Sequence, residues 1–424
     1  MKFDSYWLAT APTLKCAEQS PPEGTFDVVV VGGGFTGLSA ARTLARGGAR
    51  VALLEAGRLI GEASGRNGGQ CNTGVAQDYV SLVEQVGRER AMIHYRTYAE
   101  AVTTVEQVIR EESIECDYLH HGKLKLAAKP EHYDKLARTF EAIRRDVDPD
   151  VELLSAASVR EEVDSPLFHG GLLQRNGGQM HMGRFGIGLA QAAHHHGARL
   201  FEYAPVNAIT REGRAYRLGT PQGELRANHV LLATGASQVG PLNWFRRRMA
   251  PVGSFIVVTE PLSSEQCAQL LPNRRAYVTS RIIGNYFRLT PDNRLLFGGR
   301  ARFAISDEKS DAKSGEILRR GLAEAFPQLS DVRLDYCWGG LVDMSRDRLP
   351  HAGCHDGMHY VMGYSGHGVQ MSVHMGKSLA ETLLGQRETY PWQESEWPAI
   401  PGHFGKPWFL PLIGSWYRLQ DRLR

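Results

Sequence analysis

Residues 27–55 read DVVVVGGGFTGLSAARTLARGGARVALLE, the order of elements found in a dinucleotide-binding unit. The valine run predicts a buried parallel strand, and a second apolar strand is expected after an intervening helix. Gly32, Gly34 and Gly37 match the Gly-x-Gly-x-x-Gly pattern, which permits a tight turn, close approach of a pyrophosphate and close helix–strand packing. Glu55 ends the second strand, where a carboxylate can accept hydrogen bonds from ribose hydroxyls.

The composition is that of an ordinary globular enzyme. The chain has 424 residues, 42% of them hydrophobic and 22% charged, which allows two or three domains. A formal charge of +3 is too small to indicate nucleic acid or an anionic membrane as partner. No apolar run approaches the roughly 18 residues of a membrane span, and Asp4 argues against a signal peptide. The six scattered cysteines lack a Cys-x-x-Cys motif, so we expect no zinc site or disulfide framework and a cytoplasmic location.

Two further glycine-rich stretches favour FAD over NAD. Residues 61–70, GEASGRNGGQ, form a long loop after the second strand, and such a loop can follow an extended cofactor toward its flavin ring. Residues 363–368, GYSGHG, precede a predicted helix whose N-terminus could face the flavin edge where negative charge develops on reduction. The alternative for residues 61–70 is a plain surface loop, and the alternative for residues 363–368 is an ordinary tight turn.

The nucleotide signals lie in three separated places, 27–70, 200–236 and 358–384, with β-rich sequence between them. This predicts an α/β fold, in which a discontinuous Rossmann-like FAD-binding domain carries an inserted antiparallel-sheet α+β substrate domain. The predicted division is an N-terminal extension (1–25), the FAD-binding domain (26–80, 150–240 and 335–390), the substrate domain (81–149 and 241–334) and a C-terminal tail (391–424).

Over nearly its whole length the chain resembles the D-amino-acid-oxidase-like superfamily of FAD-dependent oxidoreductases. Within it, the chain is most similar to the γ-glutamylputrescine oxidases. The resemblance rests on the 27–55 unit, ASGRNGGQ (63–70), ATG (233–235), GYSGHG (363–368), YFRLT (286–290), DNRLL (292–296) and LQDRL (419–423). It implies oxidation of a C–H bond beside an amine nitrogen, with hydride transfer to flavin N5, hydrolysis of the imine, and reduction of O₂ to H₂O₂.

The resemblance also implies which residues hold FAD. At the pyrophosphate and adenosine it implies Gly32, Gly34, Phe35, Thr36, Gly37, Glu55, Ala56, Val206, Ala233 and Gly235. Along the ribityl chain and flavin it implies Ser64, Arg66, Asn67, Gly68, Gly69, Gln70, Gly366, His367, Gly368 and Val369. Relatives that oxidise sarcosine attach FAD through a cysteine, and the corresponding stretch 340–346 has none. We therefore expect noncovalent FAD.

The candidate catalytic residues are His367, Tyr286 and Arg288. His367 could polarise the flavin or act on substrate, or it could simply be a turn histidine. Tyr286 and Arg288 share one face of a predicted strand and could bind a substrate carboxylate; the alternative is a surface cation beside a core aromatic. Gln70 and Gln370 stand where the sarcosine-oxidising relatives carry cations, which disfavours a small α-amino acid as substrate.

Three other features favour ordinary structural roles. Lys123 and Lys125 alternate with apolar residues, which predicts a solvated strand face. The histidines at 194–196 cannot share one face of a helix, so we expect no metal site. The aromatic segment 408–417 could touch a membrane or a partner, but we expect it to dock on the protein itself.

The leading functional prediction is an FAD-dependent amine oxidase of the γ-glutamylputrescine type. The alternative is an oxidase or dehydrogenase of a cyclic or secondary amino acid such as L-pipecolate, passing electrons to a membrane carrier; Arg288 and the aromatic tail would support it. An RNA-modifying or non-catalytic flavoprotein is a third possibility, but the basic domain it would need is missing. The expected partners are an amine or imino acid and O₂ or an electron carrier, with no nucleic acid.

Overall fold

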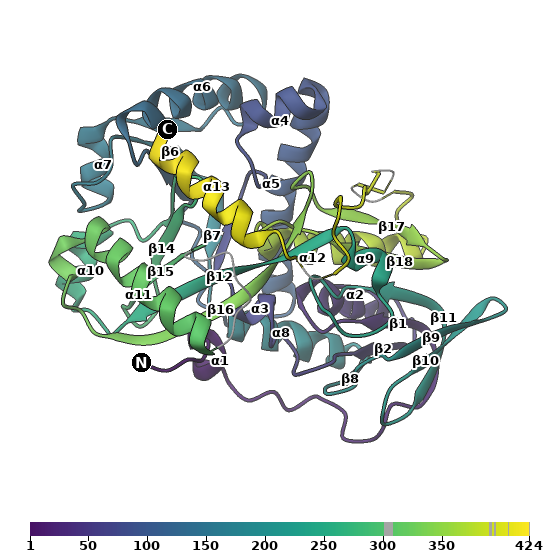
Figure 1. The fold of residues 1–424 in the computed structure, drawn as a ribbon. Helices are drawn as coiled ribbons and strands as arrows, with labels where there is room; N and C mark the ends of the chain where they lie inside the picture. The colour runs from purple at the N-terminus through teal and green to yellow at the C-terminus, as the bar shows by residue number, and fades with distance from the viewer. Residues whose placement is uncertain (301–307, 390–391, 394–395, 406, 424) are drawn as a thin grey trace.

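Two large β-sheets form the body of the protein. The computed structural model describes every residue except 301–307, 390–391, 394–395, 406 and 424. In Figure 1 the sheet that contains β1 lies on the right, and the sheet that contains β12 and β14–β16 lies on the left and centre. The predicted α/β architecture is confirmed.

The first sheet has the strand order β17-β18-β11-β1-β2-β8, with a β9–β10 hairpin added to β11. Its inner pairs, from β18 to β8, are all parallel, so their carboxyl ends meet at one edge, where ligands bind in open α/β sheets. Val28–Val31 of β1 are buried, as their uninterrupted run predicts. The strands are β1 (Gly24–Val31), β2 (Val51–Leu54), β8 (Arg199–Phe201), β9 (Ala208–Glu212), β10 (Ala215–Gly219), β11 (Glu224–Leu232), β17 (His351–His355) and β18 (Met358–Met362).

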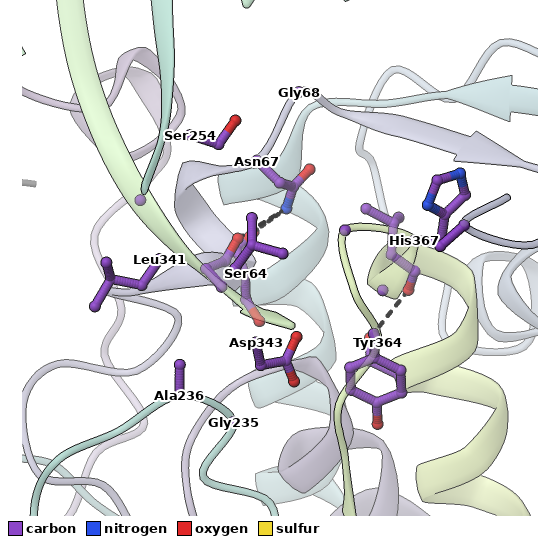
Figure 2. A pocket seen from close by; sticks show the side chains of 18 of the residues that line it. Ser64, Asn67, Gly68, Gly235, Ala236, Ser254, Leu341, Asp343, Tyr364 and His367 are labelled. Atoms are coloured by element: carbon purple, nitrogen blue, oxygen red, sulfur yellow. Dashed lines mark hydrogen bonds between the residues drawn. The ribbon is translucent and has the colours of Figure 1, made fainter. Parts of the chain in front are cut away.

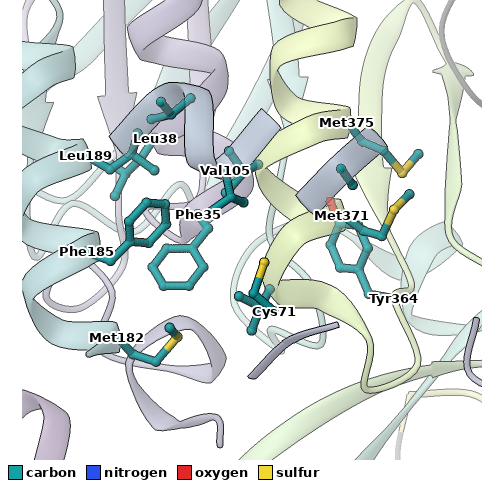
Figure 3. Packing of buried hydrophobic residues seen from close by; sticks show 14 of the residues in the cluster. Phe35, Leu38, Cys71, Val105, Met182, Phe185, Leu189, Tyr364, Met371 and Met375 are labelled. Atoms are coloured by element: carbon teal, nitrogen blue, oxygen red, sulfur yellow. The ribbon is translucent and has the colours of Figure 1, made fainter. Parts of the chain in front are cut away.

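Helices pack beside this sheet around the largest apolar core. Figure 3 shows Phe35 and Phe185 in edge-to-face contact, with their ring centroids 5.2 Å apart. A Cβ atom on Gly376 would overlap the carbonyl oxygen of Thr36, so glycine there lets α12 approach α2 closely. The helices of this layer are α2 (Phe35–Arg46), α5 (Arg88–Glu111), α8 (Met182–His195) and α12 (Gly368–Leu383).

The second sheet has the order β16-β12-β15-β14-β13-β4-β6-β5 and is mostly antiparallel. Phe255, Phe287 and Phe297 lie on one face, in a core closed by α7 (Ala156–Glu162), α10 (Ser264–Leu270) and α11 (Glu308–Ala325). The opposite face carries Tyr286 and looks toward the first sheet. The strands are β4 (Lys123–Leu126), β5 (Glu152–Leu154), β6 (Gly171–Gln174), β12 (Met249–Thr259), β13 (Ala276–Thr279), β14 (Asn285–Leu289), β15 (Leu295–Gly299) and β16 (Leu334–Ser345).

The strand pairing corrects the predicted domain boundaries at two places. β5 and β6 belong to the second sheet, because β6 pairs with β4 and β5 pairs with β6. The first part of the stretch 150–240, which was predicted to belong to the FAD-binding domain, therefore lies in the second sheet. β16 also belongs to the second sheet, through its long pairing with β12. The remaining elements are α1 (Tyr6–Thr10), α3 (Ala63–Arg66), β3 (Gln70–Asn72), α4 (Tyr79–Val86), α6 (Pro130–Asp146), β7 (Gly177–Gln179), α9 (Asn243–Arg246), a 3₁₀ turn (Pro327–Leu329) and α13 (Leu410–Leu423).

The tail helix α13, yellow in Figure 1, docks on the body as expected. Leu410 is buried against Ala250 and Val252, whereas Trp408 and Trp416 remain exposed. Among the described residues, no helix combines the length and the apolar run needed to cross a bilayer.

Candidate active site

One cavity of about 1420 Å³ runs from the carboxyl edge of the first sheet to the inner face of the second. Pockets for drug-sized ligands usually measure roughly 300–1,000 Å³, so this cavity has room for a dinucleotide and a substrate together. Figure 2 shows side chains from distant parts of the chain around this space: Ser64, Asn67, Gly235, Ala236, Ser254, Leu341, Asp343 and His367.

The turn between β1 and α2 has the backbone that a pyrophosphate requires. Gly32 has φ of 111°, and a Cβ atom there would overlap the carbonyl oxygen of Ala233. A Cβ on Gly37 would overlap the carbonyl oxygen of Gly32. The N-cap residue Gly34 places no side chain over the helix, and the first turn of α2 holds no acidic residue. The N–H groups and the positive end of the helix dipole therefore favour an anion here.

Glu55 lines the cavity directly after β2. Its carboxylate accepts hydrogen bonds from the backbone N–H groups of Gly33 (2.7 Å) and Gly57 (2.8 Å). Burial raises the pKa of Glu55, and these two hydrogen bonds oppose that effect. The carboxylate is thus held at the place predicted for the adenosine ribose.

Replacing Glu55 by Gln should weaken FAD binding roughly ten- to a hundredfold, because a hydrogen bond to a charged group contributes about 1.5–3 kcal/mol. Fluorescence titration of apoprotein with FAD measures the effect. Turnover of the fully loaded variant should change little, and an unchanged dissociation constant would show that Glu55 does not reach the cofactor.

The second glycine-rich loop, residues 61–70, is fixed by side chains. Ser64 Oγ accepts a hydrogen bond from the Phe35 N–H (3.0 Å), which ties the loop to the start of α2. The Asn67 amide donates to the Ser64 carbonyl at 2.8 Å, as Figure 2 shows, and accepts from the Gly69 N–H. The Trp7 indole of α1 donates to the carbonyl of Asn67 (2.7 Å). Sequence reasoning missed this role of residues 1–25, which it treated as an irregular extension.

The structure corrects the role predicted for Arg288. Its side chain is only 1% exposed and does not line the cavity. The guanidinium donates to the backbone carbonyls of Gly69 (2.6 Å), Met180 (2.9 Å) and Leu289 (3.2 Å). Burial lowers the pKa of Arg288 to about 9. Arg288 therefore holds the 61–70 loop in place and is not available to a substrate carboxylate.

Tyr286 and His367 do face the cavity. The Tyr286 hydroxyl lies 3.3 Å from Ser254 Oγ, and burial raises its pKa to about 12, so it stays protonated. Burial lowers the pKa of His367 to about 3, with further contributions from Lys123 and two other cations, so its ring is neutral. Nδ1 of His367 is buried and has no hydrogen-bond partner among the described residues, which leaves it available to a ligand.

The solvated strand face predicted for Lys123 and Lys125 is wrong. Both side chains are half-buried and line the cavity. Burial lowers the pKa of both, that of Lys123 to about 7, and Lys123 Nζ donates to the Thr73 carbonyl at 2.7 Å. Alternation of lysines with apolar residues looks the same whether the polar face meets solvent or an internal cavity.

Two further cavity residues had no clear signal in the sequence. Asp343 of β16 accepts a hydrogen bond from the Gly363 N–H (2.7 Å), and burial raises its pKa to about 6. Arg300 follows β15, and its guanidinium lies beside Gly366. Only the pairing of distant strands brings these two residues to the GYSGHG turn.

Most residues predicted to bind FAD line this one cavity. Gly37 and Gly69 do not: Gly37 packs against the β1 turn, and Gly69 has φ of 75° beneath the Arg288 guanidinium. Those that line it are Gly32, Gly34, Phe35, Thr36, Glu55, Ala56, Ser64, Arg66, Asn67, Gly68, Gln70, Val206, Ala233, Gly235, Gly366, His367, Gly368 and Val369.

We expect acid precipitation of the yellow holoprotein to release all of its FAD into the supernatant. None of the six cysteines, all of which are described, lines the cavity; Cys337 is buried against α11, and Cys354 is exposed on β17. The absorption spectra of supernatant and pellet give the distribution. Flavin retained on the denatured chain would contradict noncovalent binding.

Comparison with known proteins agrees with this geometry. The family model described as "FAD dependent oxidoreductase" matches residues 27–382. The chain is 32% identical to γ-glutamylputrescine oxidoreductase of Escherichia coli, over 99% of this chain and 98% of the relative. It is 33% identical to the probable oxidoreductase OrdL of Haemophilus influenzae, over 85% and 84% of the two chains.

The fold is also that of solved flavoenzymes. Glycine oxidase from Geobacillus kaustophilus superposes with a TM-score of 0.72, at 23% identity, over 89% of this chain and 99% of that one. L-Proline dehydrogenase from P. horikoshii gives a TM-score of 0.69 at 18% identity, over 87% and 96% of the two chains. The β1–α2 turn, the 61–70 loop and the cavity agree with the near full-length match, which shows that this chain belongs to the family of FAD-dependent oxidoreductases.

Proposed function

We propose that this FAD-dependent oxidoreductase oxidises the C–N bond of a γ-glutamylputrescine-type amine, with O₂ as the electron acceptor. The observation that carries the proposal is the continuation of the cavity beyond the nucleotide-binding turn into a second half under β4 and β14. The near full-length similarity to γ-glutamylputrescine oxidoreductase supports the choice of amine.

The residues present suit FAD. The β1–α2 turn and Glu55 would hold the pyrophosphate and ribose, and the 61–70 loop and the start of α12 would hold the flavin end. When bound there, FAD supplies the two-electron acceptor for amine oxidation. The N-terminus of α12, whose N-cap residue His367 makes no side-chain cap, presents the positive end of a helix dipole to that place.

The chain's own contribution is to prepare the amine. An amine must be neutral to give up a hydride from the adjacent carbon, so a group that takes up its proton is needed. Lys123 lines the substrate half, and its pKa of about 7 suits proton uptake near neutral pH. Neutral His367 and protonated Tyr286 can hydrogen-bond the substrate without adding charge.

A peroxide-release assay tests the proposal directly. Purified holoenzyme is offered putrescine, γ-glutamylputrescine, N-acetylputrescine, L-pipecolate and L-proline, with and without an artificial electron acceptor. The proposal expects the highest kcat/KM for γ-glutamylputrescine with stoichiometric peroxide. Preference for an imino acid, or turnover only with the artificial acceptor, would overturn it. The pipecolate alternative has lost one of its two supports, because Arg288 is buried in backbone contacts.

A further inference from the structure

The substrate half of the cavity carries cations in excess of acids. Lys123, Lys125 and Arg300 all line the cavity, and their positive charges contribute to the low pKa of His367. Asp78 attracts the Lys125 ammonium, but its carboxylate already pairs with Lys135 at 3.2 Å and accepts a hydrogen bond from the Ser81 N–H. Within the described part of the chain, no carboxylate forms an ion pair with Lys125 or Arg300.

The register of the second sheet places Lys125 beside the reaction space. Lys125 is opposite Val278 of β13, and Val278 is opposite Tyr286 of β14. Residues opposite each other on neighbouring strands point to the same face, and two strand spacings amount to roughly 10 Å. Tyr286 in turn packs over Gly68 of the 61–70 loop. A small molecule could therefore span the space between Lys125 and the 61–70 loop, which is predicted to hold the flavin.

An ammonium group without an ion pair is costly on a cavity wall. Burial lowers the pKa of Lys125, which measures the unfavourable loss of hydration of its charged form. Arg300 cannot lose its charge in the same way and sits in the same cavity. A ligand that brings its own negative charge would offset this cost, because a carboxylate can hydrogen-bond to the Lys125 ammonium and is attracted by the charge of Arg300.

We propose that Lys125, supported by Arg300, selects substrates that carry a carboxylate on the part of the molecule remote from the oxidised amine. This rests on the proposed function, since the γ-glutamyl group brings such a carboxylate and simple diamines do not. The two residues then determine specificity, whereas the residues that hold FAD and prepare the amine are separate from them.

Kinetics of a matched substrate pair test the inference. N-acetylputrescine keeps the amide and the free amine of γ-glutamylputrescine but has no carboxylate. Lys125→Met should raise KM for γ-glutamylputrescine roughly ten- to a hundredfold, with kcat within about twofold, because the contact is lost equally from the ground state and the transition state. KM for N-acetylputrescine should stay unchanged. Lys125→Arg should restore most of the affinity, and Lys313→Met, which removes an exposed lysine of α11, serves as the charge control.

A binding measurement separates this inference from the proposed function. Calorimetric titration of the holoenzyme with glutarate, a dicarboxylate that cannot be oxidised, should show binding that Lys125→Met weakens at least about tenfold and Lys313→Met leaves intact. If that holds while γ-glutamylputrescine is not oxidised, the proposed substrate fails but the carboxylate site stands. If γ-glutamylputrescine is oxidised and Lys125→Met changes neither KM nor glutarate binding, the inference is overturned and the function stands. Absence of glutarate binding to the wild-type holoenzyme would also overturn it.

Discussion

Gly37→Ala should yield a colourless protein that binds FAD at least roughly a hundredfold more weakly than the wild type. Alanine is the better helix former by about 1 kcal/mol, so helix propensity alone would favour the change. The added Cβ would, however, overlap the backbone carbonyl of Gly32 and crowd the Val30 side chain at 3.2 Å. Backbone cannot give way as a flexible side chain can, so the turn itself must shift and lose its shape for the pyrophosphate.

Flavin fluorescence quenching and the flavin content of the purified protein measure this effect. Gly219→Ala is the matched control, because a Cβ there meets nothing closer than 3.8 Å and Gly219 itself does not line the cavity. It should retain full FAD content. A yellow Gly37→Ala protein with unchanged affinity for FAD would show that the β1–α2 turn tolerates this displacement and that glycine is not needed at position 37.

Arg288→Ala should lower the free energy of unfolding by about 3–5 kcal/mol without changing substrate selectivity. The substitution leaves a cavity beside Trp7 and removes the donor for three backbone carbonyls, two of which, those of Gly69 and Met180, have their short contacts to the same guanidinium nitrogen. Urea unfolding of the holoprotein measures the loss of stability. The ratio of KM values for γ-glutamylputrescine and N-acetylputrescine should equal that of the wild type.

Arg333→Ala is the control for this loss of stability. Arg333 pairs with Glu260 at the surface, and its side chain is 68% exposed, so its removal should cost no more than about 1 kcal/mol. A selective rise in KM for the carboxylated substrate in Arg288→Ala would restore Arg288 as a substrate anchor and contradict the geometry described above.

The contrast between Tyr286 and Arg288 shows how much of the site can be predicted from the sequence. Strand alternation placed Tyr286 and Arg288 on one face, and that face is correct. Position along the strand then decides the role: Tyr286 meets the cavity, whereas Arg288 meets Trp7 and the backbone of the 61–70 loop. These neighbours come from the first residues of the chain and from distant loops, so no local pattern could reveal them.

The nucleotide-binding turn was predictable for the opposite reason. Gly32 and Gly37 are needed because of backbone atoms within the same short unit or just after the adjoining strand, and glycine is the residue that fits those positions. Gly34 instead faces the Ser64 side chain of the 61–70 loop. The place of Lys123 and Lys125 on the cavity wall was not predictable, because an alternating lysine pattern does not say what covers its polar face. β5, β6 and β16 were likewise not predicted as strands of the second sheet, because their pairing with other strands leaves no local pattern in the sequence.

The discontinuity of the parallel sheet also governs when the protein can become a flavoprotein during synthesis. The strand pair β11–β18 joins segments far apart in the chain, and α12, which packs on α2 where Gly376 meets Thr36, follows β18. While the ribosome is still making the second sheet, α2 lacks this partner and the GYSGHG turn does not yet exist. The apolar side of α2 must therefore be kept from aggregating through most of translation, and the cavity is complete only when residues 363–383 have emerged.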